Sequence, residues 1–331
     1  MKDSILYNYK VCVRCVTYNH APFIVDALNG FCMQETNFPY VCTIVDDAST
    51  DGEEEIIKRY LENNFDFHDY SIVWNEETDD FILTFAQHKT NKNCFFAVYF
   101  LKYNHYQKRK LKSPYFNEWA SKAKYTAICE GDDYWVNRDK LQKQVTFLDN
   151  NPNYSMCFHN AKIGYSDTSE GISMFERVID RDYYGTELFN QWIVPTASMM
   201  FISKVMDMQT IGDDRMLYGD IVFVLKCVKY GKVRGFSDEM SVYRIHTSSI
   251  THNSIIKKAD LYKKANHYLF LKDNFGECVE KKVLNNKISY AYFNMFRFEK
   301  KCSLQSWKYL LLSLKYDYNV FLKELRKKFR F

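Results

Sequence analysis

The stretch YTAICEGDDYW, residues 125–135, passes from a run of strand-forming and apolar residues straight into three carboxylates and two aromatic rings. Its first half predicts a buried strand that ends near Cys129. Glu130, Asp132 and Asp133 follow at once, and carboxylates this close repel one another unless a cation or a donor-rich ligand lies among them. We therefore expect a strand end that binds a positively charged group.

Earlier segments repeat this order of an apolar strand, a polar strand end and a helix. The predicted strands lie in KVCVRCVTYN (residues 10–19), YVCTIV (40–45), YSIVWN (70–75) and YTAIC (125–129). The predicted helices lie in APFIVDALNGFCMQ (21–34), GEEEIIKRYLEN (52–63), with Ser49, Thr50 or Asp51 as its cap, and RDKLQKQVTFLDN (138–150). Strands that alternate with helices predict an α/β fold with a doubly wound, mostly parallel sheet, which binds ligands at the carboxyl ends of its strands. The polar residues that follow these strands are expected to face one crevice.

The middle of the chain is less regular. Residues 91–116 interleave basic and aromatic residues, which fits an exposed helix and loop with a packed apolar side better than a nucleic-acid or phosphate site. Further on, the pattern predicts a strand in YSMCFHN, a lid or surface loop over residues 164–184, a helix in YGDIVFVLKCVKYG, and helices from about residue 257 onward.

The composition is that of a folded protein with a sizeable core. Of 331 residues, 47% are hydrophobic and 26% are charged, and Gly and Pro are scarce, which excludes a disordered or low-complexity chain. The N-terminus lacks the basic start and apolar run of a secretory signal, and no segment approaches the roughly 18–20 apolar residues of a membrane-spanning helix. We expect a cytosolic protein.

The ten cysteines are scattered, and several lie inside apolar strands, as Cys42 and Cys129 do. Reduced core thiols are therefore expected rather than a disulfide framework. Cys12 and Cys15 form a C-x-x-C motif within a predicted strand. Side chains three positions apart point to opposite faces of a strand, so this pair is not expected to bind a metal or to act as a redox pair.

Charge divides the chain into two parts. Residues 256–331 carry 18 Lys and Arg against 7 Asp and Glu, whereas residues 1–255 carry 27 against 34. The change predicts a catalytic or binding domain over residues 1–255 and a basic, aromatic helical extension after it. Two interpretations of the extension stay open: a cap with its aromatics in a core, or a basic, aromatic face towards an anionic membrane. Both interpretations depend on the aromatic and apolar residues of the extension, which are Trp307, Tyr309, Leu311, Leu314, Phe321, Leu325 and Phe329.

Several short motifs follow one another along the chain: VTYNHAPFI, IVDDASTD, AICEGDDYW with KLQKQVTFL, Gly219 followed by Asp220, and SVYRIHTSSI. In this order they together resemble the family 2 glycosyltransferases of the GT-A fold. The resemblance covers about residues 9–251 and extends to bacterial enzymes that build surface polysaccharides. It implies an inverting, metal-assisted transfer of a sugar from a nucleotide-diphosphate donor, foremost a UDP-sugar, to a hydroxyl of a glycan or lipid-linked acceptor.

For the EGDD cluster, the resemblance implies a site for Mn²⁺ or Mg²⁺, which would neutralise the charge that develops on the leaving diphosphate. Asp132 matches the metal-binding position of the D-x-D signature. Glu130 occupies its first position, where Asp is commoner, and the departure leaves open whether Glu130 contacts the ribose or the metal. Asp133 is expected either to bond the sugar or to support the metal site.

The resemblance also assigns residues that contact the nucleotide base and residues near the diphosphate or the metal. Asp47 matches the residue that reads the uracil ring, and Tyr18 with the backbone around Val16 matches the wall on which the base stacks. Arg244 and His246 are expected to approach the diphosphate or the metal. For His246, a role as metal ligand and a role in hydrogen bonding both stay open.

Asp220 matches the catalytic base that takes the proton from the acceptor hydroxyl. It also stands at the apparent start of a helix, where Asp is a common cap. Asp213 and Asp214 are alternative bases nearby.

Two other functions stay open. A nucleotidyltransferase has a glycine-rich phosphate loop after its first strand, where this chain has TYNHAPF without glycine. A non-catalytic, nucleotide-sugar-binding assembly subunit would tolerate the loss of the carboxylates. Nucleic-acid binding is disfavoured, because the acidic body would repel phosphate. The expected location is the cytoplasm, and the inner face of the cytoplasmic membrane if the extension binds lipid.

Overall fold

The computed structural model describes residues 8–68, 73–165, 177–191, 193–207, 215–246, 258–299 and 303–328. The chain forms two compact units. Unit 1 comprises Met1–Asp182, Trp192–Met208 and Gly231–His246, and unit 2 comprises Tyr183–Gln191, Gln209–Tyr230 and Thr247–Phe331. The domain boundary predicted after residue 255 falls outside the described ranges and stays a prediction.

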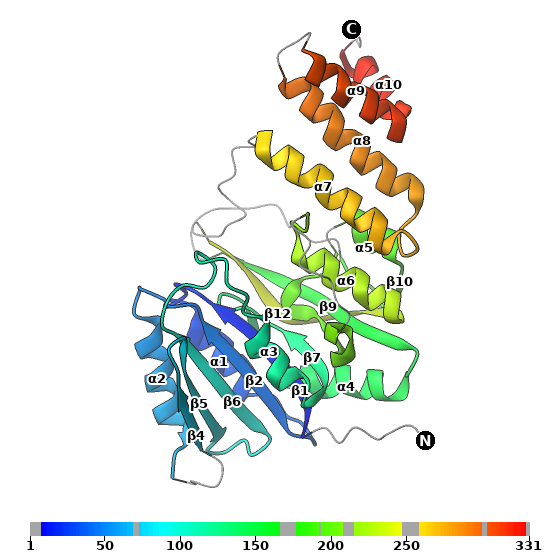
Figure 1. The fold of residues 1–331 in the computed structure, drawn as a ribbon. Coiled ribbons are helices and arrows are strands. Elements are labelled where there is room, and N and C mark those ends of the chain that lie inside the picture. Colours follow the sequence, from blue (N-terminus) through cyan, green and yellow to red (C-terminus); the bar gives the residue numbers. More distant parts are fainter. Residues whose placement is uncertain are drawn as a thin grey trace. The chain divides into compact units, whose positions relative to one another are not determined.

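Four parallel strands form the centre of the unit 1 sheet (Figure 1). They lie in the order β7 (Ala123–Ile128), β1 (Tyr9–Thr17), β2 (Tyr40–Asp46) and β6 (Cys94–Leu101). Every residue of β2 is buried. Such strands are near-continuous apolar runs because helices cover both faces of a parallel sheet.

Mostly antiparallel pairs extend the sheet on both sides. Next to β6 lies β5 (Phe81–His88), which pairs with β3 (Phe65–Asp66) and β4 (Trp74–Glu77). Next to β7 follow β11 (Met200–Ile202), β9 (Tyr154–Tyr165), β12 (Lys232–Ile245) and β10 (Arg181–Tyr183), and β8 (Tyr134–Trp135) pairs with β12. The strands β9 and β12 are parallel. The predicted α/β class with a mostly parallel central sheet is confirmed.

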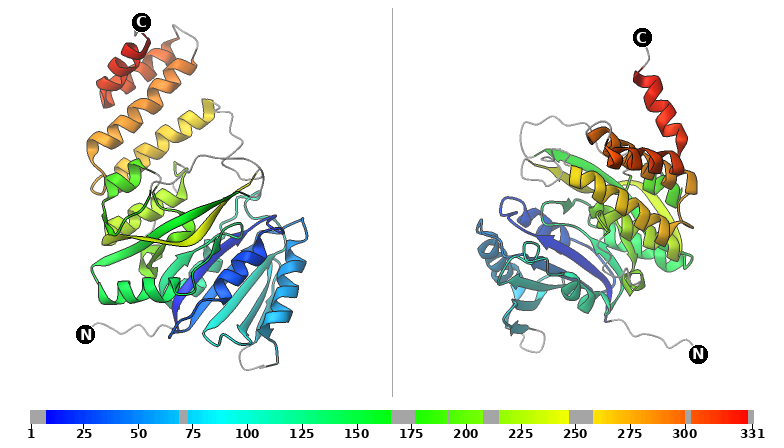
Figure 2. Two further views of the ribbon diagram at one scale, coloured as in Figure 1. Left: turned by 180° about the vertical axis from the view of Figure 1, so that it is seen from behind. Right: turned by 45° about the horizontal axis from the view of Figure 1, so that its top comes forward.

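Helices cover both faces of this sheet (Figures 1 and 2). The helices α1 (Ile24–Cys32), α2 (Glu53–Asn64) and α4 (Lys140–Asn150) pack on one face, and α3 (Ser113–Ala120) packs on the other. Cys15 lies in the first of these cores and Cys12 in the second, so the two thiols face opposite sides as predicted. The described cysteines are all free thiols. Two short 3-10 helices, Thr196–Ser198 and Ser203–Asp207, flank β11.

The prediction for residues 91–116 is wrong. This segment contains β6, buried between β2 and β5, and only then a loop and the start of α3. Along β6 the side chains alternate between the two cores, with Phe96 and Val98 in one and Ala97 and Tyr99 in the other. The aromatic residues that mimic an amphipathic helix in the sequence are therefore the two faces of a central strand.

The predicted cap of α2 is also wrong. The N-cap is Gly52, with a φ of +89° that favours glycine. Asp51 still contributes, because its Oδ1 accepts a hydrogen bond from the Glu53 N–H at 3.2 Å. The predicted strand at residues 70–75 is displaced: β4 begins at Trp74, and residues 69–72 lie outside the described ranges. Residues 166–176 of the predicted lid also lie outside the described ranges.

Unit 2 is helical. Its members are α5 (Gly185–Asn190), α6 (Gly219–Tyr230), α7 (Lys258–Phe275), α8 (Lys281–Phe298), α9 (Leu304–Tyr316) and α10 (Tyr318–Lys328). Each helix packs on the next, and α10 also packs on α8 (Figure 1). The predicted helical extension is confirmed. Within the described ranges, no helix combines the length and apolarity needed to cross a bilayer.

The predicted stripe on α9 is not the buried one. Trp307 and Leu311 are 53% and 65% exposed, and Leu314 is only partly buried. Tyr309 is 8% exposed and packs in a core between α7, α8 and α9. The buried face of α9 therefore contains Ser306 and Tyr309 and leaves Trp307 outside it. Phe329 lies outside the described residues.

Candidate functional site

Three side chains from distant parts of the sequence meet beyond the ends of β1, β7 and β12. His20 follows β1, Asp132 follows β7 and His246 follows β12. Asp132 Oδ2 lies 3.1 Å from His246 Nε2 and 3.8 Å from His20 Nε2. One ligand atom from each residue lies within 4.8 Å of the other two, which is a spacing that a metal ion can bridge. Unit 1 therefore contains a candidate metal centre at the predicted edge of the sheet.

A buried network fixes the turn that carries His20. The Glu53 carboxylate at the start of α2 is fully buried, and it accepts hydrogen bonds from the Thr17 hydroxyl, the His20 N–H and the Ser49 hydroxyl. Thr17 Oγ1 also lies 3.2 Å from His20 Nδ1. Asn19, between them, has a φ of +56°, which Asn tolerates better than most residues. The carboxyl end of β1 and the start of α2 thus together hold the turn that carries His20.

Gly131 allows the ends of β7 and β1 to approach closely. Its N–H donates to Val16 O at 3.0 Å. A Cβ at this position would come within 2.2 Å of Thr17 Oγ1 and 3.2 Å of His20 Nδ1. Because only glycine fits here, the EGDD turn packs directly on the turn that holds His20.

Arg244 ties the EGDD turn to the end of β12. Its backbone N–H donates to Asp133 Oδ1 at 2.8 Å, and its guanidinium donates to the Asp132 carbonyl oxygen at 2.8 Å. The guanidinium also pairs with Asp26 Oδ2 at 2.7 Å and lies 4.8 Å from the centre of the Phe23 ring. These contacts orient Asp132 and Asp133. A contact of Arg244 with a diphosphate stays a prediction.

The two neighbouring aspartates differ in their electrostatics. Burial alone would raise the pKa of Asp132, but the hydrogen bond from His246 and the charges of His20 and His246 lower it below its ordinary value. Burial raises the pKa of Asp133 well above its ordinary value, and the charge of Asp132 adds to this effect. Asp132 is therefore the anionic member of the pair and the one that favours a cation.

Asp47 is almost fully buried, and protein groups hold its carboxylate. It accepts hydrogen bonds from the N–H groups of His105 at 2.7 Å and Tyr106 at 3.2 Å. Lys112 Nζ lies 2.6 Å from Asp47 Oδ2. The loop between β6 and α3 is thus tied to the end of β2. Oδ1 retains one lone pair for a further donor, so the base-reading role of Asp47 stays a prediction.

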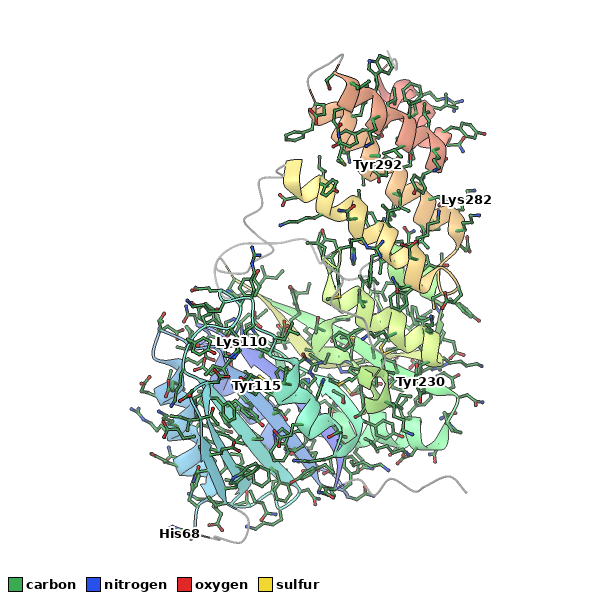
Figure 3. All side chains as sticks on the ribbon, viewed as in Figure 1. His68, Lys110, Tyr115, Tyr230, Lys282 and Tyr292 are labelled. Atoms are coloured by element: carbon green, nitrogen blue, oxygen red, sulfur yellow. The ribbon has the colours of Figure 1, made fainter. Side chains whose placement is uncertain are left out.

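The same loop has contacts of its own. Lys110 Nζ lies 2.8 Å from Asp80 Oδ2, and His105 Nε2 lies 3.0 Å from the Tyr115 hydroxyl. Lys110 and Tyr115 are labelled in Figure 3, near the amino end of α3. These contacts connect the loop to the turn before β5 and to α3 as well as to Asp47.

The predicted donor and metal residues all lie in unit 1. Glu130 is exposed, while Tyr18 and Val16 are partly buried at the end of β1. The structure brings Asp132 and His246 into direct contact, and it places the others at the ends of β1, β2, β7 and β12: Val16, Tyr18, Asp47, Glu130, Asp133 and Arg244.

Asp220 lies in the first turn of α6, in unit 2. Its Oδ1 accepts a hydrogen bond from the Ile221 N–H at 2.8 Å. Burial raises the pKa of Asp220 above its ordinary value. Both the capping and the base interpretation remain open. Asp213 and Asp214 lie outside the described residues.

The sequence pattern does not single out His20, Thr17 or Glu53. A signal was available for His20, because a possible metal ligand directly follows the YN of a strand end, just as carboxylates follow the other strands. Glu53 is one of three consecutive glutamates in an apparently exposed first turn. Its burial depends on the pairing of β1 with β2, which no local pattern reveals.

Residues 12–88, from β1 to β5, match the family model described as glycosyl transferase family 2. This segment therefore resembles the family 2 glycosyltransferases. Rv1520 of Mycobacterium tuberculosis and Mb1547 of Mycobacterium bovis, both described as uncharacterised, are 27% identical to the chain over 255 residues. The match covers 76% of this chain and 63% of each relative, so the chain spans less than two thirds of their length.

Solved structures of S. aureus TarS, residues 1–349, share the fold. One has a TM-score of 0.56 at 15% identity and covers 93% of this chain and 80% of that chain. The complex of TarS with UDP-GlcNAc has a TM-score of 0.55 at 16% identity and covers 92% and 79%. This likeness confirms the predicted GT-A fold.

Proposed function

We propose that the protein is an inverting glycosyltransferase that moves a sugar from a nucleotide-diphosphate donor to a hydroxyl of a glycan or lipid-linked acceptor. The observation that carries this proposal is the convergence of His20, Asp132 and His246 at the strand ends of a GT-A sheet, where such sheets bind ligands. TarS, of the same fold, was crystallised with UDP-GlcNAc, which supports a UDP-sugar as the first donor to test.

A divalent cation, Mn²⁺ or Mg²⁺, held by Asp132 and His246 would neutralise the charge on the leaving diphosphate. The donor set fits this role, because Asp132 is anionic and its Oδ2 faces an imidazole at 3.1 Å. Glu130 would contact the ribose or the metal, Asp133 would bond the sugar or support the metal site, and Arg244 would contact the diphosphate.

The nucleoside would lie at the ends of β1 and β2. Tyr18 and the backbone at Val16 would form the wall against which the base stacks. Asp47 would accept the imide N–H of uracil through the remaining lone pair of Oδ1. Surface-polysaccharide synthesis is the process that this donor and acceptor class would serve.

Asp220 is the proposed general base. A buried carboxyl with a raised pKa is a better proton acceptor near neutral pH than an exposed one. A direct displacement that uses one base and no enzyme nucleophile inverts the anomeric centre. Asp220 must be ionised to accept the proton. Because the pKa of Asp220 is raised, the transfer rate should fall as the pH drops through that raised pKa.

A panel of nucleotide-sugars tests the donor class first. Metal-dependent hydrolysis or binding of at least one UDP-sugar is expected, with release of UDP. Incorporation of the nucleotide itself into a product would favour the nucleotidyltransferase alternative, and binding without any turnover would favour a non-catalytic subunit.

Asp220→Asn tests the base. The variant should bind donor as the wild type does but transfer the sugar about a hundredfold or more slowly, which is typical of the loss of a general base. Asp273→Asn, on exposed α7 surface in the same unit, is the matched control and should leave the rate unchanged. Near wild-type turnover in Asp220→Asn would assign the base to another residue.

We also propose that the helical extension holds the enzyme at an anionic membrane surface, where a lipid-linked acceptor would lie. The exposed side chains of α9 include Leu304, Trp307 and Leu311 together with Lys308 and Lys315. These five residues recur at helical spacing and so share one face. The sequence of α9 contains no Asp or Glu. An apolar stripe lined with lysines and free of acids suits the interface of an anionic bilayer.

A further inference from the structure

We propose that His20 is a third protein ligand of the cation, and that the resulting set of two imidazoles and one carboxylate selects transition-metal ions such as Mn²⁺ over Mg²⁺. The inference rests on the proposed function, since the same ion is the one that assists the donor.

The spacing of the three ligand atoms fits one ion. Metal ions bind imidazole nitrogen and carboxylate oxygen at about 2.1 Å, so two ligands of one ion lie about 3.0 to 4.2 Å apart. Asp132 Oδ2 lies 3.1 Å from His246 Nε2 and 3.8 Å from His20 Nε2, and no pair of the three atoms exceeds 4.8 Å. A small contraction brings all three donors onto one centre.

The network around Thr17 defines which nitrogen of His20 is available. The Thr17 hydroxyl donates its one proton to the buried Glu53 carboxylate, so Oγ1 can only accept from His20. The contact of 3.2 Å between Oγ1 and His20 Nδ1 then requires a proton on Nδ1. Nε2 is therefore the ring nitrogen that faces the Asp132 carboxylate and that a metal ion could use.

This arrangement places His20 Nε2 opposite the Asp132 carboxylate oxygen. A cation bound at this point would take the place of a proton on the imidazole nitrogen and join it to the carboxylate oxygen. His246 Nε2 lies on the same oxygen, and the His246 side chain is 5% exposed, so water screens this contact poorly. The two rings lie with centroids 6.0 Å apart, with Asp132 Oδ2 as their common neighbour.

The donor set decides which ion is preferred. Mg²⁺ takes oxygen ligands, and imidazole suits transition metals. The other two carboxylates of the EGDD turn do not belong to the cluster: Asp133 is turned to the Arg244 N–H, and Glu130 is exposed. Three protein ligands would leave the other coordination positions of the ion for diphosphate oxygens and water.

Binding of Mn²⁺ and Mg²⁺ to the full-length, metal-free protein without nucleotide tests the proposal. Calorimetry should give an affinity for Mn²⁺ at least about tenfold higher than for Mg²⁺. His20→Gln should lower the Mn²⁺ affinity about tenfold or more and change the Mg²⁺ affinity little, since an amide oxygen replaces the imidazole. His68→Gln, at an exposed position outside the cluster, is the matched control and should change neither.

Two further variants separate the ligand from its support. Thr17→Val keeps the shape of the side chain but removes the hydroxyl, and it should lower the Mn²⁺ affinity about tenfold by freeing the His20 ring. Pulsed electron paramagnetic resonance of bound Mn²⁺ should detect two directly coordinated nitrogens in the wild type and one in His20→Gln.

The outcomes distinguish this inference from the proposed function. Asp132→Asn should abolish binding of both ions. If it does, but His20→Gln retains Mn²⁺ affinity and two coordinated nitrogens, the role of His20 is overturned and the proposed metal site stands. If Asp132→Asn leaves Mn²⁺ binding unchanged, the metal site itself is overturned and the role of His20 falls with it.

Discussion

Asp46 and Asp132 are both aspartates at strand ends, but they lie in opposite electrostatic environments. Asp132 faces two imidazoles that lower its pKa. Asp46 is fully buried; its Oδ1 accepts a hydrogen bond from the Ser49 N–H, and its Oδ2 has no hydrogen-bond partner among the described residues. Burial raises the pKa of Asp46 to about 7, and the nearby Glu53 charge adds to this effect. One carboxylate is suited to hold a cation and the other to hold a proton.

Asp46→Asn should therefore stabilise the protein increasingly as the pH rises. The native state keeps the Asp46 proton up to about pH 7, while the unfolded state loses it near pH 4, so the wild type loses stability across this window as the pH rises. The variant lacks this loss, because an amide oxygen can still accept from Ser49. Its free energy of unfolding relative to the wild type should rise by about 3 kcal/mol between pH 4 and pH 7.

Chemical denaturation over that pH range checks this expectation. Asp149→Asn is the control, because Lys10 and Lys124 offset the effect of burial and lower the pKa of Asp149 below its ordinary value. It should show no such rise between pH 4 and pH 7. A flat difference for Asp46→Asn as well would mean that Asp46 is ionised in the folded protein at low pH.

Residue types at strand ends were the part of the site that the sequence could predict. Asp132 and His246 meet as the EGDD and RIH motifs suggest. His20 was missed because its partner Glu53 lies 33 residues away and becomes a neighbour only when β1 pairs with β2. The role of Gly131, which allows the two turns to touch, depends on the same tertiary contact.

At the scale of elements, the loop between β6 and α3 is anchored by one buried ion pair. Lys112 reaches Asp47 at 2.6 Å, where the carboxylate is 2% and the lysine side chain 19% exposed. The N–H groups of His105 and Tyr106 complete the anchor. The end of β2 and this basic loop are therefore held together beside the proposed nucleoside site.

Lys112→Met should loosen this loop. Removing the cation leaves a buried carboxylate with two N–H donors, which should cost about 1–3 kcal/mol of stability, discounted for the partial exposure of Lys112. Hydrogen exchange should speed up at the His105 and Tyr106 amides. Lys108→Met, an exposed lysine of the same loop, is the control and should stay within about 0.5 kcal/mol of the wild type. Equal protection in both variants would contradict the anchor.

Element prediction succeeded where a strand is a continuous apolar run that ends in polar residues, as in β1, β2 and β7. It failed for β6, because Lys92 and Lys102 flank an aromatic strand and give it the appearance of an exposed helix. The buried stripe of α9 was misplaced for a related reason. The large side chain of Trp307 led to its prediction as a core residue, yet Ser306 and Tyr309 are the residues that face the neighbouring helices.

At the scale of the whole molecule, charge is unevenly distributed. Residues 256–331 carry 18 basic against 7 acidic residues, and the remainder carries an acidic excess. Basic residues near an anionic bilayer contribute about 1 kcal/mol each, and this attraction weakens with salt. The basic excess of residues 256–331 therefore fits the membrane docking that we propose for α9.

Co-sedimentation with vesicles tests the membrane proposal. The bound fraction should rise with the content of anionic lipid and fall with added salt. Replacing both Trp307 and Leu311 by Gln should reduce it strongly, while Tyr230→Gln, an exposed aromatic on α6, should not. Figure 3 labels Tyr230. A full-length protein that stays in the supernatant at low salt with strongly anionic vesicles would leave the extension as a structural cap or a protein-binding surface.

We propose above all that Asp132 holds a divalent cation, which in turn binds a nucleotide diphosphate. Calorimetric titration of the full-length protein with UDP, with and without Mn²⁺, tests it most directly. The wild type should bind UDP at least about tenfold more tightly with Mn²⁺ than without it, and Asp132→Ala should lose that difference while it stays folded. An unchanged affinity and an unchanged metal dependence in Asp132→Ala would contradict the claim.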